Sequence, residues 1–261
     1  MSSRPLPNTP PFPPPVAGRV LSFDGTAIHF DLYDRPSRGL VVVIPGFWRE
    51  RRHPAMVRLA SLLHGTGYRV AVVDVRGHGE SGGTYGFNLH EHHDVATVVG
   101  HLLEKMALES VTLLGLSYGG SIAVSTAARH ELPLSSLLLI SAVADFAMIT
   151  PRLNVFSLHR HIAVGQAFHK PRFDWKMKRS AKLRALDDVQ NVRVPICLIH
   201  VKDDWLVGHT HSEALFRRAN EPKEIHILDV NGNYHADRIF TVAHDVIEPL
   251  LTDFLIRHTL R

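Results

Sequence analysis

The chain has 261 residues, of which 45% are hydrophobic and 21% charged, and its formal net charge at pH 7 is +4. A chain of this length buries a full hydrophobic core, and its ordinary composition excludes a disordered chain, a collagen-like repeat and a disulfide scaffold. The one cysteine, Cys197, cannot form an internal disulfide, and no run of 18 apolar residues is present. We therefore expect a cytoplasmic protein without stable membrane insertion.

Residues 1–18 are expected to form a flexible, proline-rich arm. Seven prolines occur between Met1 and Pro15, and this stretch contains no apolar run long enough for a secretory signal. Proline disfavours helix interiors and central strands, so the arm should be extended. A proline-rich ligand for a partner domain is the alternative to a solvated tail.

After the arm, branched apolar runs alternate with stretches of helical periodicity. Asp24-Gly25 lies between the apolar runs Val20–Phe23 and Ala27–Tyr33, which is typical of a β-hairpin. Further strands are expected at Leu40–Ile44, Arg69–Val75, Ser110–Leu116, Ser136–Ile140, Pro195–Val201 and Glu224–Val230. Helices are expected at Pro54–His64, Leu89–Met106, Tyr118–Arg129, His211–Asn220 and Thr241–His258.

Two of these helices carry signals at the level of single residues. Asn88 stands just before the second helix with Glu91 three residues later, a pattern that predicts an N-cap at Asn88. Pro249 lies inside the last helix and should kink or divide it, because proline cannot donate a backbone hydrogen bond.

A hairpin followed by repeated strand and helix units predicts an α/β fold. We expect a mostly parallel, eight-stranded sheet with helices on both faces, built from residues 19–147 and 185–261. In such sheets ligands bind at the carboxyl ends of the strands. We therefore expect the functional residues in the loops that follow the strands.

Residues 148–184 are expected to form a basic helical lid over the strand ends. No strand is evident between Asp145 and Val194, an interval longer than a simple crossover needs. From Pro151 to Arg184 there are nine Lys or Arg and one acidic residue, a local charge of +8. This charge could attract an anionic substrate, although a solvated cationic face is the alternative. No recognised nucleic-acid-binding module accompanies it, so we expect no nucleic-acid partner.

A Gly-x-Ser-x-Gly sequence, Gly115-Leu116-Ser117-Tyr118-Gly119, lies between a predicted strand and a predicted helix. In this context a tight turn lifts the serine hydroxyl above the sheet, and glycine on each side lets strand and helix approach closely. We therefore predict that Ser117 is a nucleophile.

A serine hydroxyl needs a base, and the base needs an acid that orients it. His235 follows the last predicted strand and is the preferred base, whereas His209, His211 and His244 fall in or beside predicted helices. Asp203 and Asp204 follow the strand Pro195–Val201, and we prefer Asp204. Asp145 is a third candidate for the acid. The chain order Ser, Asp, His matches that of α/β-hydrolases.

Four stretches together carry a resemblance to a known family. They are Ile44-Pro45-Gly46-Phe47, Asp74-Val75-Arg76-Gly77-His78-Gly79-Glu80-Ser81, the serine turn, and Val201-Lys202-Asp203-Asp204-Trp205-Leu206-Val207. From Val20 to Leu260 the chain resembles an α/β-hydrolase-fold serine hydrolase of the esterase and lipase type. The family's usual Gly-x-x-Asp followed by an apolar pair favours Asp204 as the acid.

The resemblance implies that backbone N–H groups of Phe47 and Tyr118 form an oxyanion hole. Two departures are visible: Pro45 replaces the family's usual histidine before the oxyanion loop, and Val201 replaces the usual glycine before the acid. Pro45 lacks only its own N–H, so the chemistry is preserved while the shape of the loop is open. Trp48, Trp205 and Tyr234 adjoin these positions and are candidates for an apolar acyl-binding pocket.

The predicted function is that of a cofactor-free serine hydrolase that cleaves a carboxylic ester or thioester through Ser117, His235 and Asp204. Its expected partner is a small-molecule acyl substrate. Amidase, peptidase or acyltransferase activity on the same residues is an alternative, and a non-catalytic binding module is another.

Two further clusters of polar residues carry weaker signals. No metal is expected at His90–Asp94, because the His-Glu-x-x-His pattern fails at position 94. Arg49, Arg51 and Arg52 are expected in a solvated loop, with contact to an acidic substrate as the alternative.

Overall fold

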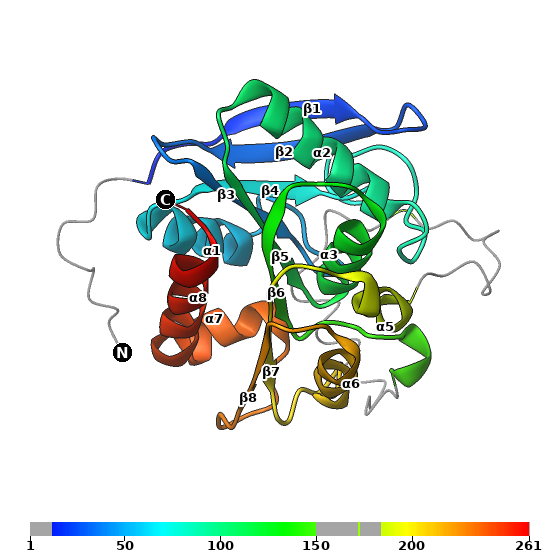
Figure 1. Cartoon of the computed structure of the whole chain (residues 1–261), viewed down its shortest axis with the longest axis vertical. Coiled ribbons are helices and arrows are strands. Elements are labelled where there is room, and N and C mark those ends of the chain that lie inside the picture. Colours follow the sequence, from blue (N-terminus) through cyan, green and yellow to red (C-terminus); the bar gives the residue numbers. More distant parts are fainter. Residues whose placement is uncertain (1–11, 150–171, 173–183, 261) are drawn as a thin grey trace.

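The computed structural model describes residues 12–149, 172 and 184–260. Eight strands form one sheet in the order β1-β2-β4-β3-β5-β6-β7-β8 (Figure 1). They are β1 (Val16–Leu21), β2 (Ala27–Tyr33), β3 (Gly39–Ile44), β4 (Arg69–Asp74), β5 (Ser110–Leu116), β6 (Leu134–Ile140), β7 (Ile196–Val201) and β8 (Lys223–Leu228). Of these strands, β2 runs against the others, so the carboxyl ends of β3 to β8 share one edge.

Helices cover both faces of this sheet (Figure 1). One face carries α1 (Pro54–Gly65), α7 (Ile239–Val242) and α8 (His244–His258). The other carries α2 (Glu91–Lys105), α3 (Tyr118–Arg129), α5 (Ala185–Asp188) and α6 (Thr210–Arg218). Short 3-10 turns lie at Phe146–Met148, Val189–Asn191 and Ala236–Arg238. The expected fold class, a mostly parallel eight-stranded sheet with helices on both faces, is confirmed.

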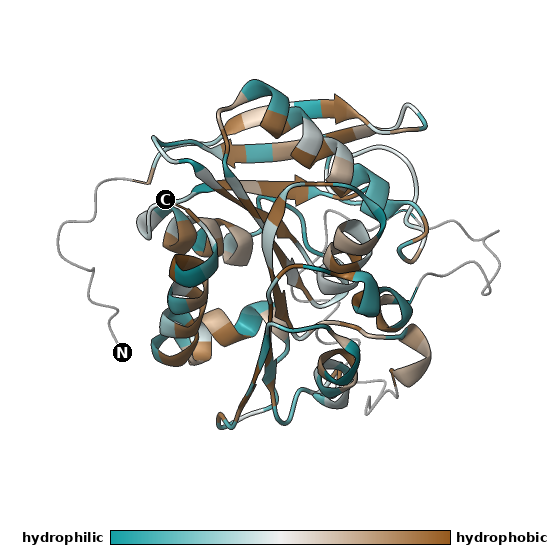
Figure 2. Ribbon diagram, in the orientation of Figure 1, coloured by the Kyte–Doolittle hydropathy of each residue, from teal (hydrophilic) through white to brown (hydrophobic). Residues whose placement is uncertain are grey.

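Alternation along the central strands produces two cores. All six residues of β3 are buried, and Val42 packs with α2 and α3 whereas Val41 and Val43 pack with α1 and α8. Successive side chains of a strand point to opposite faces, so a continuous apolar strand is the expected sequence of a sheet covered twice. Figure 2 shows these hydrophobic strands between the helical layers.

The start of the sheet differs from the sequence-based boundary. β1 begins at Val16, so the last three residues of the arm predicted over residues 1–18 belong to a strand that pairs with β2. Before it, the Phe12 ring stacks on Tyr33 with 4.5 Å between ring centroids. Apolar burial of one aromatic side chain therefore fixes the end of the arm against the core.

Two single-residue predictions concern helices: the N-cap at Asn88 is wrong, and the last helix is not divided at Pro249. His90, not Asn88, is the N-cap of α2, because Asn88 is buried and its side-chain amide donates to Ser121 O and Ser125 Oγ instead. The last helix divides at Ala243, not at Pro249, which lies inside α8. Pro249 and Asp245 are both exposed, so water can bind the carbonyl that loses its partner.

The predicted basic lid at 148–184 lies almost entirely outside the described residues. Within it, Arg172 joins the loop after β4: its backbone N–H donates to Gly77 O (2.9 Å) and its carbonyl accepts from Tyr85 N (2.7 Å). Among the described helices, none is both long and apolar enough to cross a membrane.

Candidate active site

Ser117 lies in a sharp turn between β5 and α3, with φ 53° and ψ −118°. The neighbouring glycines permit this turn, because a Cβ on Gly115 would lie 2.4 Å from Gly119 O and a Cβ on Gly119 would lie 2.1 Å from Ile44 O. A positive φ at a non-glycine residue is strained and persists only where the surrounding packing enforces it. The sequence thus places the hydroxyl of Ser117 at the carboxyl edge of the sheet.

Three side chains from separate loops form a continuous chain of hydrogen bonds. His235 Nε2 lies 2.8 Å from Ser117 Oγ, and His235 Nδ1 lies 2.7 Å from Asp204 Oδ2. A carboxylate only accepts, so Nδ1–H donates to Asp204 and Nε2 is left to accept the serine proton. This is the tautomer that a general base for Ser117 needs.

The other candidates for acid and base have different partners. Asp203 is exposed, and Asp145 accepts from Ala147 N (2.8 Å) and pairs with Arg184 (3.4 Å). His209 Nδ1 contacts Lys202 O, His211 Nδ1 accepts from Ala144 N, and His244 pairs with Asp245. The structure therefore brings Asp204 and His235 to Ser117.

Buried donors hold the Asp204 carboxylate. Its Oδ1 accepts from the backbone N–H groups of Leu206 (2.9 Å) and Val207 (3.0 Å). Burial by itself raises the pKa of Asp204, but the adjacent His235 and His200 rings outweigh it and hold the pKa well below its usual range. The carboxylate is thus ionised across the neutral pH range.

The loop after β3 lies against the serine turn. A Cβ on Gly46 would lie 3.1 Å from Ser117 Cβ, so a side chain here would require a shift of a few tenths of an ångström in the turn. Phe47 follows directly, and Tyr118 is the first residue of α3, where backbone N–H groups have no partner within the helix. Both residues predicted to supply oxyanion donors therefore adjoin Ser117.

An aromatic cluster extends from this loop. Phe47 packs on Trp48, His78 and Tyr85, with ring centroids 4.3 Å, 5.6 Å and 4.8 Å apart. Tyr85 continues the cluster to Tyr118 at 4.7 Å. The sequence singled out Phe47, Trp48 and Tyr118, but His78 and Tyr85 join them only through the folded loop after β4.

Trp205 and Tyr234 are half-buried and lie on the loops that carry Asp204 and His235. The Tyr234 ring covers Gly232, where a Cβ would lie 2.7 Å from the ring. Their position fits the prediction that they lie near the site, and a role in substrate binding stays a prediction.

The sequence analysis did not predict two contacts that position the catalytic loops. His200 Nε2 lies 2.8 Å from Val207 O and 3.5 Å from Asp204 Oδ2, and its Nδ1 lies 2.7 Å from Ser212 Oγ. Arg49 contacts Asp237 at 3.3 Å and so connects the loop after β3 to the loop of His235. His200 interrupts the apolar run Pro195–Val201, and this was the sequence feature that could have indicated a buried polar role.

The expectation of a solvated arginine loop is wrong for Arg51, whereas Arg52 is exposed and Arg49 partly exposed. Arg51 is 1% exposed and pairs with Asp31, Asp74 and Glu80, and Arg52 pairs with Asp31 and Glu80. These acids come from β2 and from the loop at the end of β4, which the sequence does not place beside the arginines. These ion pairs hold the loop in place, and the Arg51 charge is neutralised by them and is not available to bind a substrate.

Two groups of side chains in the described part of the chain have the composition of metal ligands, and neither includes Ser117. They are His92, His93 and His130, and Cys197, Glu224 and His226. The second group is committed to other partners, because both Glu224 oxygens accept from Arg257 at 2.9 Å and burial raises the pKa of the Cys197 thiol.

Comparison with known proteins adds a family to this geometry. A model of the alpha/beta hydrolase family matches residues 41–251. No curated protein sequence matches the chain.

Solved structures of similar fold include several hydrolases. An esterase of Pyrococcus furiosus superposes with a TM-score of 0.75 at 18% identity, covering 98% of each chain. An alpha/beta hydrolase of Penicillium sp. sh18 gives 0.77 at 18% identity, covering 94% of this chain and 99% of that one. A monoacylglycerol lipase of Paleococcus ferrophilus gives 0.68 at 19% identity, covering 88% and 99%. At these identities the likeness shows the fold.

Proposed function

The chain belongs to the alpha/beta hydrolase family, and we propose that it is a serine hydrolase that cleaves a carboxylic ester or thioester through an acyl-enzyme intermediate. The observation that carries this proposal is the hydrogen-bonded chain from Ser117 through His235 to Asp204, with distances of 2.8 Å and 2.7 Å. Nucleophile, base and orienting acid in contact are the parts that acyl transfer needs.

In the proposed reaction, Ser117 Oγ attacks the substrate carbonyl while His235 Nε2 takes the hydroxyl proton. The imidazolium then protonates the leaving alcohol or thiol as the tetrahedral intermediate collapses. Water, deprotonated by His235, releases the acyl group and restores Ser117. Asp204 stays ionised throughout and stabilises the imidazolium.

The negative charge of the tetrahedral intermediate needs donors that are already in place. We assign them to the backbone N–H groups of Phe47 and Tyr118, on the two segments that meet at Gly46 and Ser117. A donor of this kind contributes about 3 kcal/mol to transition-state stabilisation. Tyr118 also stands at the positive end of the α3 dipole, which favours an anion.

The acyl group is proposed to be apolar. The partly exposed rings of Phe47 and Trp48 adjoin the nucleophile and offer apolar faces rather than charges, and the buried Tyr85 and Tyr118 pack behind them. The arginines of the loop after β3 are neutralised internally, so they do not select an acidic acyl group there. We place the enzyme in the cytoplasm, since its one cysteine is buried and unpaired.

Amide cleavage and acyl transfer to acceptors other than water would use the same residues and remain alternative activities. The esterase and the monoacylglycerol lipase among the structural neighbours favour ester cleavage. A non-catalytic binding module is the alternative of a different class. It is disfavoured because it would not require the Ser117–His235–Asp204 contacts.

A fluorophosphonate probe tests the proposal directly. We expect stoichiometric labelling that is abolished in Ser117→Ala, reduced at least a hundredfold in rate in His235→Ala, and unchanged in Ser61→Ala on α1. The reduction follows because a serine hydroxyl without its base is a poor nucleophile. A folded protein that is not labelled at Ser117, or that is labelled equally fast in His235→Ala, would establish the binding module instead.

Substrate preference is measured with p-nitrophenyl esters of increasing chain length beside the matched anilides and acyl-CoA thioesters. We expect kcat/KM for esters to exceed that for anilides. It should rise with acyl length until the acyl chain fills the space beside the aromatic rings. Preference for anilides would assign the amidase alternative.

A further inference from the structure

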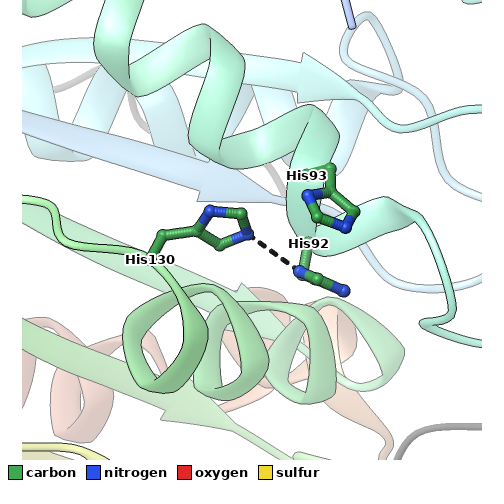
Figure 3. Close-up of side chains that lie close together, drawn as sticks. All are labelled: His92, His93 and His130. Atoms are coloured by element: carbon green, nitrogen blue, oxygen red, sulfur yellow. Dashed lines mark hydrogen bonds between the residues drawn. The ribbon is translucent and has the colours of Figure 1, made fainter. Parts of the chain in front are cut away.

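Three histidine rings meet where α2 begins and α3 ends (Figure 3). His92 and His93 belong to the first turn of α2, and His130 is the C-cap of α3. One nitrogen from each ring lies within 4.8 Å of the other two, and His92 Nδ1 and His130 Nε2 are 2.9 Å apart. The sequence showed only the His90–Asp94 stretch, because His130 is 38 residues away from His92.

The surroundings keep these rings neutral. Burial lowers the pKa of all three, that of His92 to about 3, and the neighbouring imidazoles and Arg129 lower it further. The acids nearby have other partners: Asp94 accepts from Arg76 and Ser22, and Asp188 from Arg129. A neutral imidazole carries a free lone pair, which is the form that ligates a metal ion.

The spacing of the ring nitrogens is close to that of a metal site. Tetrahedral coordination with zinc–nitrogen bonds of about 2.0–2.1 Å separates ligand nitrogens by about 3.3 Å. The 2.9 Å contact between His92 and His130 is a hydrogen bond whose shared proton the ion would replace. It is slightly shorter than this separation, and the 4.8 Å limit on the other nitrogens is longer. Side-chain rotations that move nitrogens by about an ångström would complete the geometry. His93 and His130 are half-buried, so an ion can reach the cluster from solvent.

We propose that His92, His93 and His130 form a binding site for a divalent cation of the zinc class, with water as a further ligand. Imidazole ligands favour Zn²⁺, Cu²⁺ and Ni²⁺ over Mg²⁺ or Ca²⁺. The site is separate from the catalytic one, because α3 separates His130 from Ser117 by about 20 Å at 1.5 Å per residue.

Such an ion would connect the first turn of α2 to the end of α3. These helices pack on the same face of the sheet, and the Phe23 ring of the β1–β2 turn lies 4.5 Å from that of His93. The predicted role is therefore structural: the metal holds two helices and the hairpin together, and the chain without metal folds but unfolds at a lower temperature.

Binding is tested on the full chain, without an affinity tag and stripped with EDTA, by titration calorimetry with Zn²⁺ and by the visible absorption of Co²⁺. We expect one ion per chain, a tetrahedral Co²⁺ spectrum and a higher melting temperature with Zn²⁺. His130→Gln and the half-buried His93→Gln should each weaken Zn²⁺ binding by at least about tenfold. Circular dichroism checks that both variants fold.

Two matched variants serve as controls. His90→Gln removes a neighbouring histidine outside the group, and His226→Gln disables the Cys197–Glu224–His226 group; both should retain Zn²⁺ affinity. Absence of stoichiometric Zn²⁺ binding, or binding that survives His130→Gln and is lost in His226→Gln, would overturn the proposal. Labelling of Ser117 by the fluorophosphonate should persist in His130→Gln, so this test is independent of the proposed hydrolase activity.

Discussion

At the scale of single residues, the loop from Asp204 to Val207 is held from two directions. Its backbone N–H groups donate to Asp204 Oδ1, while the Val207 carbonyl faces His200 Nε2 at 2.8 Å. His200 in turn contacts Ser212 on α6 at 2.7 Å. The carboxylate therefore has one orientation before substrate binds, and that orientation determines which nitrogen of His235 carries the proton.

Replacing Asp204 with asparagine should reverse this tautomer. A side-chain amide at position 204 that donates to His235 Nδ1 forces the proton onto Nε2, which then cannot accept from Ser117. By analogy with the same change in a serine protease, we expect kcat/KM to fall by about 10⁴. The free energy of unfolding should fall as well, because the ionised Asp204 is stabilised by His235 and His200. The measurement is p-nitrophenyl ester hydrolysis beside urea unfolding.

Asp203→Asn is the matched control for this prediction, because Asp203 is adjacent and exposed. Its kcat/KM should match that of the unaltered chain. Equal losses in both variants would mean that Asp204 does not orient His235.

The residues that the sequence could supply are those with a local signature. Ser117 stands in a strand-turn-helix pattern, and His235 and Asp204 follow strands whose carboxyl ends share an edge. His200 and Asp237 have no such pattern, since their partners Val207, Ser212 and Arg49 become neighbours only through loop conformation. The catalytic roles themselves stay predictions until activity is measured.

At the scale of elements, the sequence predicts existence and type better than boundaries. The runs that became β2, β5 and α3 were predicted with their observed bounds, because hydrophobic period and flanking turn residues agree there. The division of the last helix was predicted at the wrong residue. The sequence shows Pro249 but does not show that this residue lies on the solvent-exposed side of α8. Asn88 was misassigned because its buried partners lie on α3.

The approach of α3 to β3 limits what the serine turn tolerates. A Cβ on Gly119 would lie 2.1 Å from Ile44 O and 2.6 Å from Pro45 O, both backbone atoms. Gly119→Ala should therefore push α3 away from the sheet and lower the free energy of unfolding by about 3 kcal/mol or more. Thermal and urea unfolding measure the loss.

Gly100 in the middle of α2 is the matched control. A Cβ there meets nothing within 4 Å, so Gly100→Ala should raise the free energy of unfolding by about 0.5–1 kcal/mol. If the Gly119→Ala variant were as stable as the unaltered chain, the prediction would be wrong, because α3 and β3 could then separate without a loss of stability.

At the scale of the whole molecule, charge and protonation are unevenly distributed. The stretch Pro151–Arg184 has a formal charge of +8, whereas the whole chain has +4, so the rest of the chain has −4. Within the described residues, seven of the 19 histidines of the chain have a pKa below the ordinary value, and burial is the largest cause in each. Three of these seven, His78, His92 and His211, are buried, so the folded chain holds them as neutral imidazoles.

Stability should accordingly decline in mild acid. Burial lowers the pKa of His78 and of His211 to about 4 and that of His92 to about 3, against about 6.5 in the unfolded chain. Between these values the unfolded chain binds more protons, so the stabilisation is complete above pH 6.5 and is lost as the pH falls toward 4. We expect the free energy of unfolding, measured by urea titration with EDTA, to fall by at least about 2 kcal/mol from pH 7 to pH 5.

Single replacements identify the source of this decline. His78→Gln removes one of three buried imidazoles and should reduce the dependence on pH by about a third, whereas His244→Gln, on an exposed position of α8, should leave it unchanged. The carboxylates whose pKa is lowered, Asp204 and Glu224 among them, act only in stronger acid, because their stabilisation is lost below their ordinary pKa of about 4. A free energy of unfolding that stays constant from pH 7 to pH 5 would contradict the assignment of neutral histidines to the core.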